Sequence, residues 1–355
     1  MSSLVERCAR EQPATLRRAL RELPRTAAGL AARVAADVAG RGGAVRSVTL
    51  LGAGSSLNAA LTAVDAFRAA TGAPTAVHES VALGRGPAAP EPGPGDLLVA
   101  VSQSGASTAT VAAAARAAAA GATAVLVTAG PAPAGVLRLD VACGPEDVGA
   151  KTKGYAHTVL ALAALAAALG GQGLPPGSGA LPGAVAALLA DDGAVRATAA
   201  AAAAGAPLVL LSSGPDLGTV REGALKFSEI TRLPARWSSG EEFLHGEHRT
   251  LTPATRLVVV SGPTADAARD RDLVRVLRRA AGHVLLVTGE RRAGDHPGGT
   301  LVVPGDLPAG VFPVAAVVPL QLLALRAAAA RGVDPDEAVL ADLVREFGTK
   351  AAAAG

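Results

Sequence analysis

The chain has 355 residues, of which 50% are apolar and 18% charged, a composition that supplies buried cores and excludes a disordered protein. At this length we expect two domains rather than one. Aromatic residues are only 2% and the net charge is +3, which argues against base-stacking platforms and against a basic patch. We therefore expect no nucleic-acid partner.

The cysteines and the N-terminal segment argue against further classes of protein. Cys8 and Cys143 lie far apart without metal-ligand spacing, so neither a zinc site nor a disulfide framework is expected. The first twenty residues carry charges throughout and lack the apolar region of a signal peptide. The apolar run over 158–169 is too short to span a membrane. We expect a cytoplasmic protein with no membrane partner.

The first half of the chain alternates between helical and strand-like segments. A helical stretch is expected over about 13–40, before the first strand. Alanine-rich runs such as 113–120 indicate packed helices, since alanine is the best helix former. Short β-branched runs bounded by Gly or Pro predict five buried parallel strands, over 47–54, 74–80, 96–105, 123–130 and 138–144.

The pattern then repeats at an offset of 160 residues, the separation between positions 47 and 207. A second set of five strands is expected over 207–214, 235–239, 256–262, 283–289 and 300–305. A helix over 314–332 and a polar tail follow them. The predicted fold class is α/β, with two tandem doubly wound parallel sheets. The predicted domains are an N-terminal helical segment 1–46, a first domain 47–169, a linker 170–183, a second domain 184–335 and a tail 336–355.

The loop after the first strand contains Gly54, Ser55 and Ser56 at a strand-to-helix turn. In open α/β sheets ligands bind outside the carboxyl ends of the strands, and a helix N-terminus offers free N–H groups to an anion. The third glycine of a dinucleotide fingerprint is absent, since Leu57 stands in its region. An anion site and an ordinary tight turn both remain open, and no nucleotide cofactor is expected.

The loop after the third strand is richer in polar groups, with Ser102, Gln103, Ser104 and Ser107 on a turn that opens a helix. Hydroxyls, an amide and the helix dipole together favour a phosphate cradle without a lysine. The P-loop motif is missing, so a nucleoside triphosphatase is not expected. A helix N-cap that happens to be serine-rich is the structural alternative. The second repeat has Ser-Gly-Pro-Thr at 261–264, so we expect the cradle only once.

Charged residues concentrate between positions 221 and 249. Glu222, Lys226 and Glu229 are spaced four and three residues apart, which places them on one face of a helix, where a solvated ion-pair face is the alternative. The following loop, 241–248, contains two histidines and three glutamates. If His245 and Glu229 converge, they form an acid/base pair suited to neutral pH. A metal site is not expected, because no further ligand cluster accompanies the two histidines.

These motifs resemble the sugar isomerase (SIS) domain family, in particular the isomerase half of glucosamine-6-phosphate synthase and the fructosamine-6-phosphate deglycases. The resemblance runs through GAGSS at 52–56, SQSGAS at 102–107, the stretch 146–153, EGALKFSEI at 222–230, the loop 240–246 and VPLQLLAL at 318–325. It implies two flavodoxin-like SIS domains in a homodimer, with the site at or near the subunit interface. It also implies that the serines at 55, 56, 102, 104 and 107 and Gln103 hold a sugar phosphate.

The same resemblance assigns the chemistry. Glu229 matches the carboxylate that shuttles the proton, and His245, sixteen residues later, matches the histidine that opens the ring or protonates the leaving group. Glu222 and Lys226 are expected beside the substrate. Proton movement between C1 and C2 of a sugar phosphate needs one such base and one such acid.

The chain also departs from the family pattern. No glutamine-hydrolysing domain is expected, so we expect no transfer of ammonia from glutamine. Lys151 replaces a hydroxyl residue, and it either binds a carboxylate or second phosphate or is a surface lysine. The synthase carries a tail lysine that forms an imine with the ketose. The sole tail lysine here is Lys350, beside an Ala/Gly end that we expect to be frayed, so no imine is expected.

The leading hypothesis is an aldose–ketose isomerase of a phosphorylated sugar or amino sugar, working through an enediol or enediolamine. A fructosamine-6-phosphate deglycase is the alternative, because it begins with the same proton removal. A sugar-phosphate-binding regulator without catalysis is the third hypothesis. We would expect such a regulator to carry a DNA-binding helix-turn-helix, for which the 46 residues before the first strand are too few.

Overall fold

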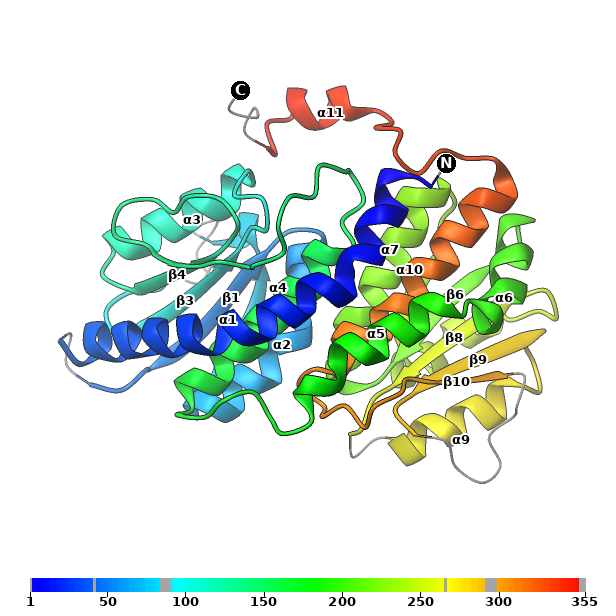
Figure 1. The fold of residues 1–355 in the computed structure, drawn as a ribbon, viewed down its shortest axis with the longest axis horizontal. Coiled ribbons are helices and arrows are strands. Elements are labelled where there is room, and N and C mark those ends of the chain that lie inside the picture. Colours follow the sequence, from blue (N-terminus) through cyan, green and yellow to red (C-terminus); the bar gives the residue numbers. More distant parts are fainter. Residues whose placement is uncertain (1, 41–42, 84–90, 265–266, 291–298, 351–355) are drawn as a thin grey trace. The chain divides into compact units, whose positions relative to one another are not determined.

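The structure is a computed structural model, and it describes residues 2–40, 43–83, 91–264, 267–290 and 299–350. Each of two compact units holds one five-stranded sheet. The β1–β5 unit comprises Arg17–Pro145, His157–Leu174 and Ala338–Gly355, and the β6–β10 unit comprises Met1–Leu16, Glu146–Ala156 and Pro175–Glu337. Figure 1 shows the helices and strands of each unit.

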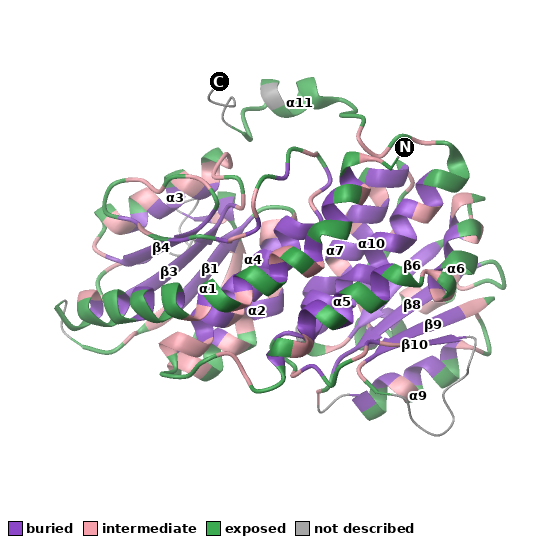
Figure 2. Ribbon diagram, in the orientation of Figure 1, coloured by how far each residue is buried: buried purple, intermediate pink, exposed green. Residues whose placement is uncertain are grey.

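The first sheet is entirely parallel and has the order β2-β1-β3-β4-β5. All five predicted strands are present, as β1 (Ser47–Gly52), β2 (Thr75–Glu79), β3 (Asp96–Val101), β4 (Thr123–Val127) and β5 (Leu137–Leu139). In register, Val48 of β1 lies opposite Thr75 of β2 and Leu97 of β3. β3 and β4 are buried along their whole length, as Figure 2 shows, which explains their unbroken apolar runs.

Alanine-rich helices pack on this sheet. Ala113, Ala114 and Ala117 of α3 contribute to one core with Leu98 of β3 and Leu126 of β4. Small side chains allow the helix to lie close to the strands. The helices with most of their residues in this unit are α1 (Leu4–Gly40), α2 (Ser55–Thr71), α3 (Thr108–Ala119), α4 (Lys153–Leu169) and α11 (Ala341–Glu346), with a short turn η1 (Ser80–Ala82).

The second sheet repeats the topology, with the parallel order β10-β9-β8-β6-β7. In both units the chain begins at an inner strand, adds the second strand on one side and the remaining three on the other. The two tandem doubly wound sheets predicted from the 160-residue offset are thus confirmed. The strands are β6 (Leu208–Ser212), β7 (Arg236–Ser239), β8 (Arg256–Ser261), β9 (His283–Thr288) and β10 (Thr300–Val302).

The helices of the β6–β10 unit surround one long apolar helix, α10 (Phe312–Arg331), which packs against α5, α6 and α7. α10 is long and apolar enough to cross a membrane, but 89% of its apolar window is buried, so it is a core helix. The remaining elements are α5 (Leu181–Ala190), α6 (Gly193–Ala203), α7 (Leu217–Thr231), α8 (Gly240–Leu244), α9 (Ala267–Leu277), η2 (Ser178–Ala180), η3 (Gly214–Asp216) and η4 (Glu247–Thr250).

Two segments differ from the sequence-based expectation. α1 begins at Leu4 and continues through Pro13 and Pro24, although a proline inside a helix costs about 3 kcal/mol. Buried side chains recur along it every three or four residues, from Val5 to Val38, and their packing outweighs the proline penalty. The segment 170–183, expected as a linker, contains η2 and the first turn of α5.

Candidate functional site

The phosphate-binding candidates of the β1–β5 unit lie at the topological switch point of its sheet. β1 lies between β2 and β3, so the connection from β1 to β2 and the connection from β3 to β4 run in opposite directions, and sheets of this kind bind ligands outside the carboxyl ends of these strands. Ser55 and Ser56 are the first residues of α2, with Gly54 at its N-cap position with φ 56°. A Cβ on Gly52 would lie 2.6 Å from the backbone nitrogen of Leu57. This tight turn therefore requires glycine.

The loop after β3 forms a compact polar turn at the N-terminus of α3. The buried Ser102 hydroxyl accepts a hydrogen bond from the Ser107 N–H at 3.3 Å, and the Ser102 carbonyl accepts one from the Gly105 N–H at 2.9 Å. The Ser104 hydroxyl accepts from the Ala106 N–H at 3.3 Å. Ser107 occupies the N-cap position, but its hydroxyl pairs with Thr110 and does not cap α3. Ser107 thus takes the N-cap position without a side-chain capping bond, and the serine-rich N-cap alternative stays open.

Neighbouring loops hold this turn in place. Gly105 has φ 75°, and a Cβ on Gly130, in the loop after β4, would lie 3.0 Å from the Ser104 carbonyl oxygen. Gln103 donates through its side-chain amide to the Cys143 sulfur at 3.3 Å. The cradle, which we define as residues 102–108, is thus packed against the loop after β4 and against Cys143.

The chain's tail lies against the cradle. Lys350 forms an isolated antiparallel bridge with Ser107, and the Thr108 N–H donates to the Thr349 carbonyl at 3.3 Å. The Thr108 hydroxyl donates to the Gly348 carbonyl at 2.8 Å. Hydrogen bonds to the carbonyls of Gly348 and Thr349 therefore hold this segment, whereas the Ala/Gly end 351–355, which we expected to be frayed, lies outside the described residues.

The acid/base candidates of the β6–β10 unit are carried by α7. Glu222 and Lys226 are 0% and 1% exposed, and the Lys226 ammonium lies 3.5 Å from a Glu222 carboxylate oxygen. Lys226 also pairs with Glu229, whose side chain keeps 36% of its exposure. Burial works to lower the pKa of Lys226, but the two carboxylates outweigh it and raise that pKa. The solvated-face alternative is therefore wrong for Glu222 and Lys226.

Packing fixes the position of α7. A Cβ on Gly223 would lie 2.5 Å from a methyl carbon of Leu320 on α10 and 2.7 Å from one of Leu210 on β6. Only a residue without a side chain allows this approach. The helix that carries the buried Lys226 network is therefore seated tightly on the core.

His245 lies apart from that network. It is the C-cap residue of α8, its side chain is 68% exposed, and its Nε2 lies 3.5 Å from a carboxylate oxygen of Glu241. Glu241 also pairs with Arg269, whose hydrogen bond and positive charge lower the pKa of Glu241. Within the described part of the chain, Glu229 and His245 do not pair with each other. Their predicted convergence stays a prediction.

The structure offers no metal centre among the residues it describes, since no three His, Cys, Asp or Glu side chains come together there. The segment 241–248, expected as a loop, folds into α8 and η4 with a short turn between them, and its two histidines have separate surroundings. His245 faces Glu241, whereas His248 belongs to η4.

One positioning residue that the sequence analysis left unassigned is Glu146. Its carboxylate accepts hydrogen bonds from the N–H groups of Thr152, Lys153 and Gly154 and from the Thr152 hydroxyl, so it holds the N-terminus of α4. The Lys151 ammonium donates to the Glu146 main-chain carbonyl. The surface-lysine alternative for Lys151 is left open, because its side chain is half-buried and turned onto its own loop.

Two buried glutamines extend this network through the β6–β10 unit. The Gln321 side chain, on α10, donates to the Thr152 carbonyl at 3.2 Å and accepts from the side chain of Gln12 at 2.9 Å. Both glutamines are 0% exposed. The resemblance motifs at 146–153 and 318–325 are therefore in direct contact.

Asp216 is a second residue that sequence reasoning missed. It stands 160 residues after Ser56, so it occupies the corresponding place at the switch point of the second sheet. It is 2% exposed, and its carboxyl accepts from the Gly262 N–H at 2.7 Å. Burial raises its pKa to about 7, with Asp270 adding to the rise and the Gly262 bond opposing it. The Asp216 carboxyl thus takes the Gly262 N–H, and that donor is not offered to an anion at the second switch point.

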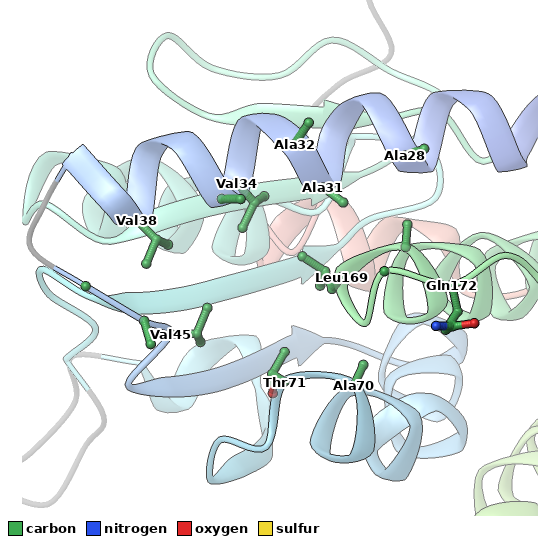
Figure 3. A pocket seen from close by; sticks show the side chains of 15 residues that line it. Ala28, Ala31, Ala32, Val34, Val38, Val45, Ala70, Thr71, Leu169 and Gln172 are labelled. Atoms are coloured by element: carbon green, nitrogen blue, oxygen red, sulfur yellow. The ribbon is translucent and has the colours of Figure 1, made fainter.

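A hollow of about 620 Å³ in the β1–β5 unit is unrelated to this chemistry. Figure 3 shows it lined by Ala28, Val34 and Val38 of α1, together with Val45 and Leu169. Val45 precedes β1, so the hollow lies near the amino ends of the strands, opposite the cradle. None of its described lining residues is titratable. It therefore has no groups for acid/base work.

Comparison with known proteins identifies the family. Residues 44–168 match the family model described as SIS domain. Residues 44–168 are therefore an SIS domain. The chain is 38% identical over 155 residues to a "Putative D-galactosamine-6-phosphate deaminase" of Streptomyces coelicolor, a match that covers 41% of this chain and 40% of that relative.

Solved structures extend the likeness over the length of the chain. A "putative phosphosugar isomerase" from Silicibacter pomeroyi is 25% identical with a TM-score of 0.78, over 94% of this chain and 100% of that one. The C-terminal domain of glucosamine-fructose-6-phosphate aminotransferase from Francisella tularensis has a TM-score of 0.76 over 95% and 98% of the two chains. Its 17% identity establishes the shared fold alone. None of these three relatives is named a deglycase.

Proposed function

We propose that this protein is an aldose–ketose isomerase of phosphorylated sugars or amino sugars. The observation that carries the proposal is the Glu222–Lys226–Glu229 network on α7. A buried ammonium between two carboxylates is expensive to desolvate and is typical of sites whose chemistry needs it. Glu229 is the member with substantial exposure, so it is the carboxylate that a substrate can reach.

The proposed chemistry gives each residue one task. The cradle binds the phosphate through hydroxyl and N–H donors and the α3 dipole. Glu229 removes a proton from the carbon next to the carbonyl and returns it to the neighbouring carbon, with an enediol or enediolamine between the two steps. Lys226 holds the carboxylate in place, and His245 moves the proton of the sugar oxygen or opens the ring.

The relatives support a phosphorylated sugar as the substrate class. One is named a "putative phosphosugar isomerase" and another a "Putative D-galactosamine-6-phosphate deaminase", a name that denotes an amino-sugar substrate. Removal of the proton beside the carbonyl or imine begins isomerisation, deamination and deglycation alike. We further propose a homodimer, as the family resemblance implies, which light scattering of the purified protein tests. A cytoplasmic location is proposed from the charges of the N-terminal segment.

The test is a substrate panel in deuterated water. The wild-type protein is incubated with fructose, tagatose, glucosamine and galactosamine 6-phosphates and with a glycated lysine 6-phosphate. NMR then follows deuterium at C1 and C2, and an assay follows released amine. Interconversion of an aldose and ketose phosphate supports the proposal. Amine release from the glycated amino acid alone supports the deglycase, and binding of a sugar phosphate without exchange supports a regulator; either result overturns the isomerase.

A further inference from the structure

The cradle must hold a dianion, yet the seven residues 102–108 include no charged side chain. Its donors to a phosphate are hydroxyls, N–H groups and the helix dipole, none of which carries a full charge. Arg138 lies nearby, but its guanidinium binds the carbonyls of Ala129 and Gly130 and pairs with Asp140. A cation that contacts the phosphate would therefore come from another segment.

The bridge between Ser107 and Lys350 supplies one. The hydrogen bond between the two segments is made by their neighbours Thr108 and Thr349, so Ser107 and Lys350 are a non-hydrogen-bonded antiparallel pair. In such a pair the two side chains project from the same side, with Cβ atoms about 4.5 to 5.5 Å apart. The Lys350 side chain therefore starts beside the Ser107 hydroxyl.

The second observation concerns the ion-pair partners of the Lys350 ammonium. In the described part of the chain its ammonium has no acidic partner. Each of the other three lysines has a partner. Lys151 donates to the main-chain carbonyl of Glu146, and Lys153 pairs with the carboxylate of Glu11. Lys226 pairs with the carboxylates of Glu222 and Glu229. A four-carbon stem carries an ammonium about 5 Å beyond Cβ, far enough to reach an anion held by Ser107 and its neighbours.

We propose that Lys350 is the cation of the phosphate cradle, brought there by the main-chain pairing of residues 348–350. This inference rests on the proposed function, because it takes the substrate to be a sugar phosphate. The ammonium contacts a phosphoryl oxygen without forming a covalent bond. Its role is that of a point charge, which an arginine can also fill.

The experiment compares Lys350→Met with Lys350→Arg, using inorganic phosphate and fructose 6-phosphate as probes at low salt. Lys350→Met should raise Kd about tenfold for both probes, the loss expected of one charge-assisted hydrogen bond. Lys350→Arg should stay within about threefold of wild type, because the charge is kept. Arg33→Met, which removes a positive charge from the exposed face of α1 in the same unit, is the matched control and should change nothing. The exposed Lys350 position predicts unaltered thermal unfolding.

Each outcome has a distinct meaning. Wild-type affinity in Lys350→Met, beside a loss in Ser102→Ala with Ser104→Ala, overturns the role of Lys350 and leaves the cradle intact. Equal losses of turnover in the Met and Arg variants, with a borohydride adduct on Lys350, overturn it in favour of imine chemistry. Absence of any phosphate binding by the wild type overturns the proposed function itself, and the inference with it.

Discussion

Replacement of Asp216 by asparagine tests the buried carboxyl at the second switch point. Asparagine keeps an acceptor oxygen for the Gly262 N–H and never ionises. In the wild type, burial raises the pKa of Asp216 from 3.8 to about 7, assisted by Asp270. We predict that Asp216→Asn is more stable than the wild type at neutral and alkaline pH.

The magnitude follows from proton linkage. Because the folded-state pKa lies above the unfolded value, the stability that this group contributes is complete at low pH and is lost as the pH rises from about 4 through about 7. The gap between 3.8 and about 7 corresponds to about 4 kcal/mol, at about 1.4 kcal/mol per pH unit. The advantage of Asp216→Asn should grow by about 2 to 3 kcal/mol between pH 5 and pH 8 and then level off.

Urea unfolding followed by circular dichroism measures this directly at pH 5, 6, 7 and 8. The control is Asp272→Asn, whose side chain is 72% exposed and pairs with Arg275, and which should show no such growth. Parallel stability curves for wild type and Asp216→Asn between pH 5 and pH 8 would refute the reasoning. Asp216 would then not be a buried, protonatable group.

Two further predictions concern phosphate binding by the cradle and the packing of α7 at Gly223. Ser102→Ala with Ser104→Ala should raise the Kd for fructose 6-phosphate at least about 100-fold in calorimetry, because two hydrogen bonds to a charged group are lost; unchanged affinity would place the anion elsewhere. Gly223→Ala should lower the free energy of unfolding by about 1 to 2 kcal/mol, because the new methyl group overlaps Leu320. Gly29→Ala, a helical glycine with open space around its Cβ position, should instead gain up to about 1 kcal/mol. An increase in the free energy of unfolding of Gly223→Ala would contradict the close packing of α7 against Leu320.

The sheets could be predicted because buried parallel strands leave a strong local signal. Runs such as Asp96–Val101 and Thr123–Val127 are buried at every position, so each is apolar without interruption and bounded by turn residues. The start of α1 could not be placed, because Pro13 looks like a helix boundary until the stripe of buried side chains on both sides of it is seen.

The placement of candidate residues was predictable where it depends on side-chain type and spacing, as for the serines at the N-terminus of α3 and for Glu222, Lys226 and Glu229 on one face of α7. It was not predictable where a distant partner decides the role. The pairing of Lys350 with Ser107 uses main-chain atoms and has no sequence pattern. Asp216 could have been found by its 160-residue separation from Ser56, but its contact with Gly262 depends on the folded sheet.

The proton-shuttling role of Glu229 is the central claim, and hydrogen exchange in Glu229→Gln tests it most directly. The variant keeps the shape of the side chain and should still bind substrate. Its rate of deuterium incorporation at C1 or C2 of a turned-over sugar phosphate should fall at least about 100-fold, as for loss of a general base. Glu247→Gln, a partly exposed glutamate paired with Arg236, is the control and should exchange at the wild-type rate. Undiminished exchange in Glu229→Gln would contradict the account and assign the proton to another carboxylate.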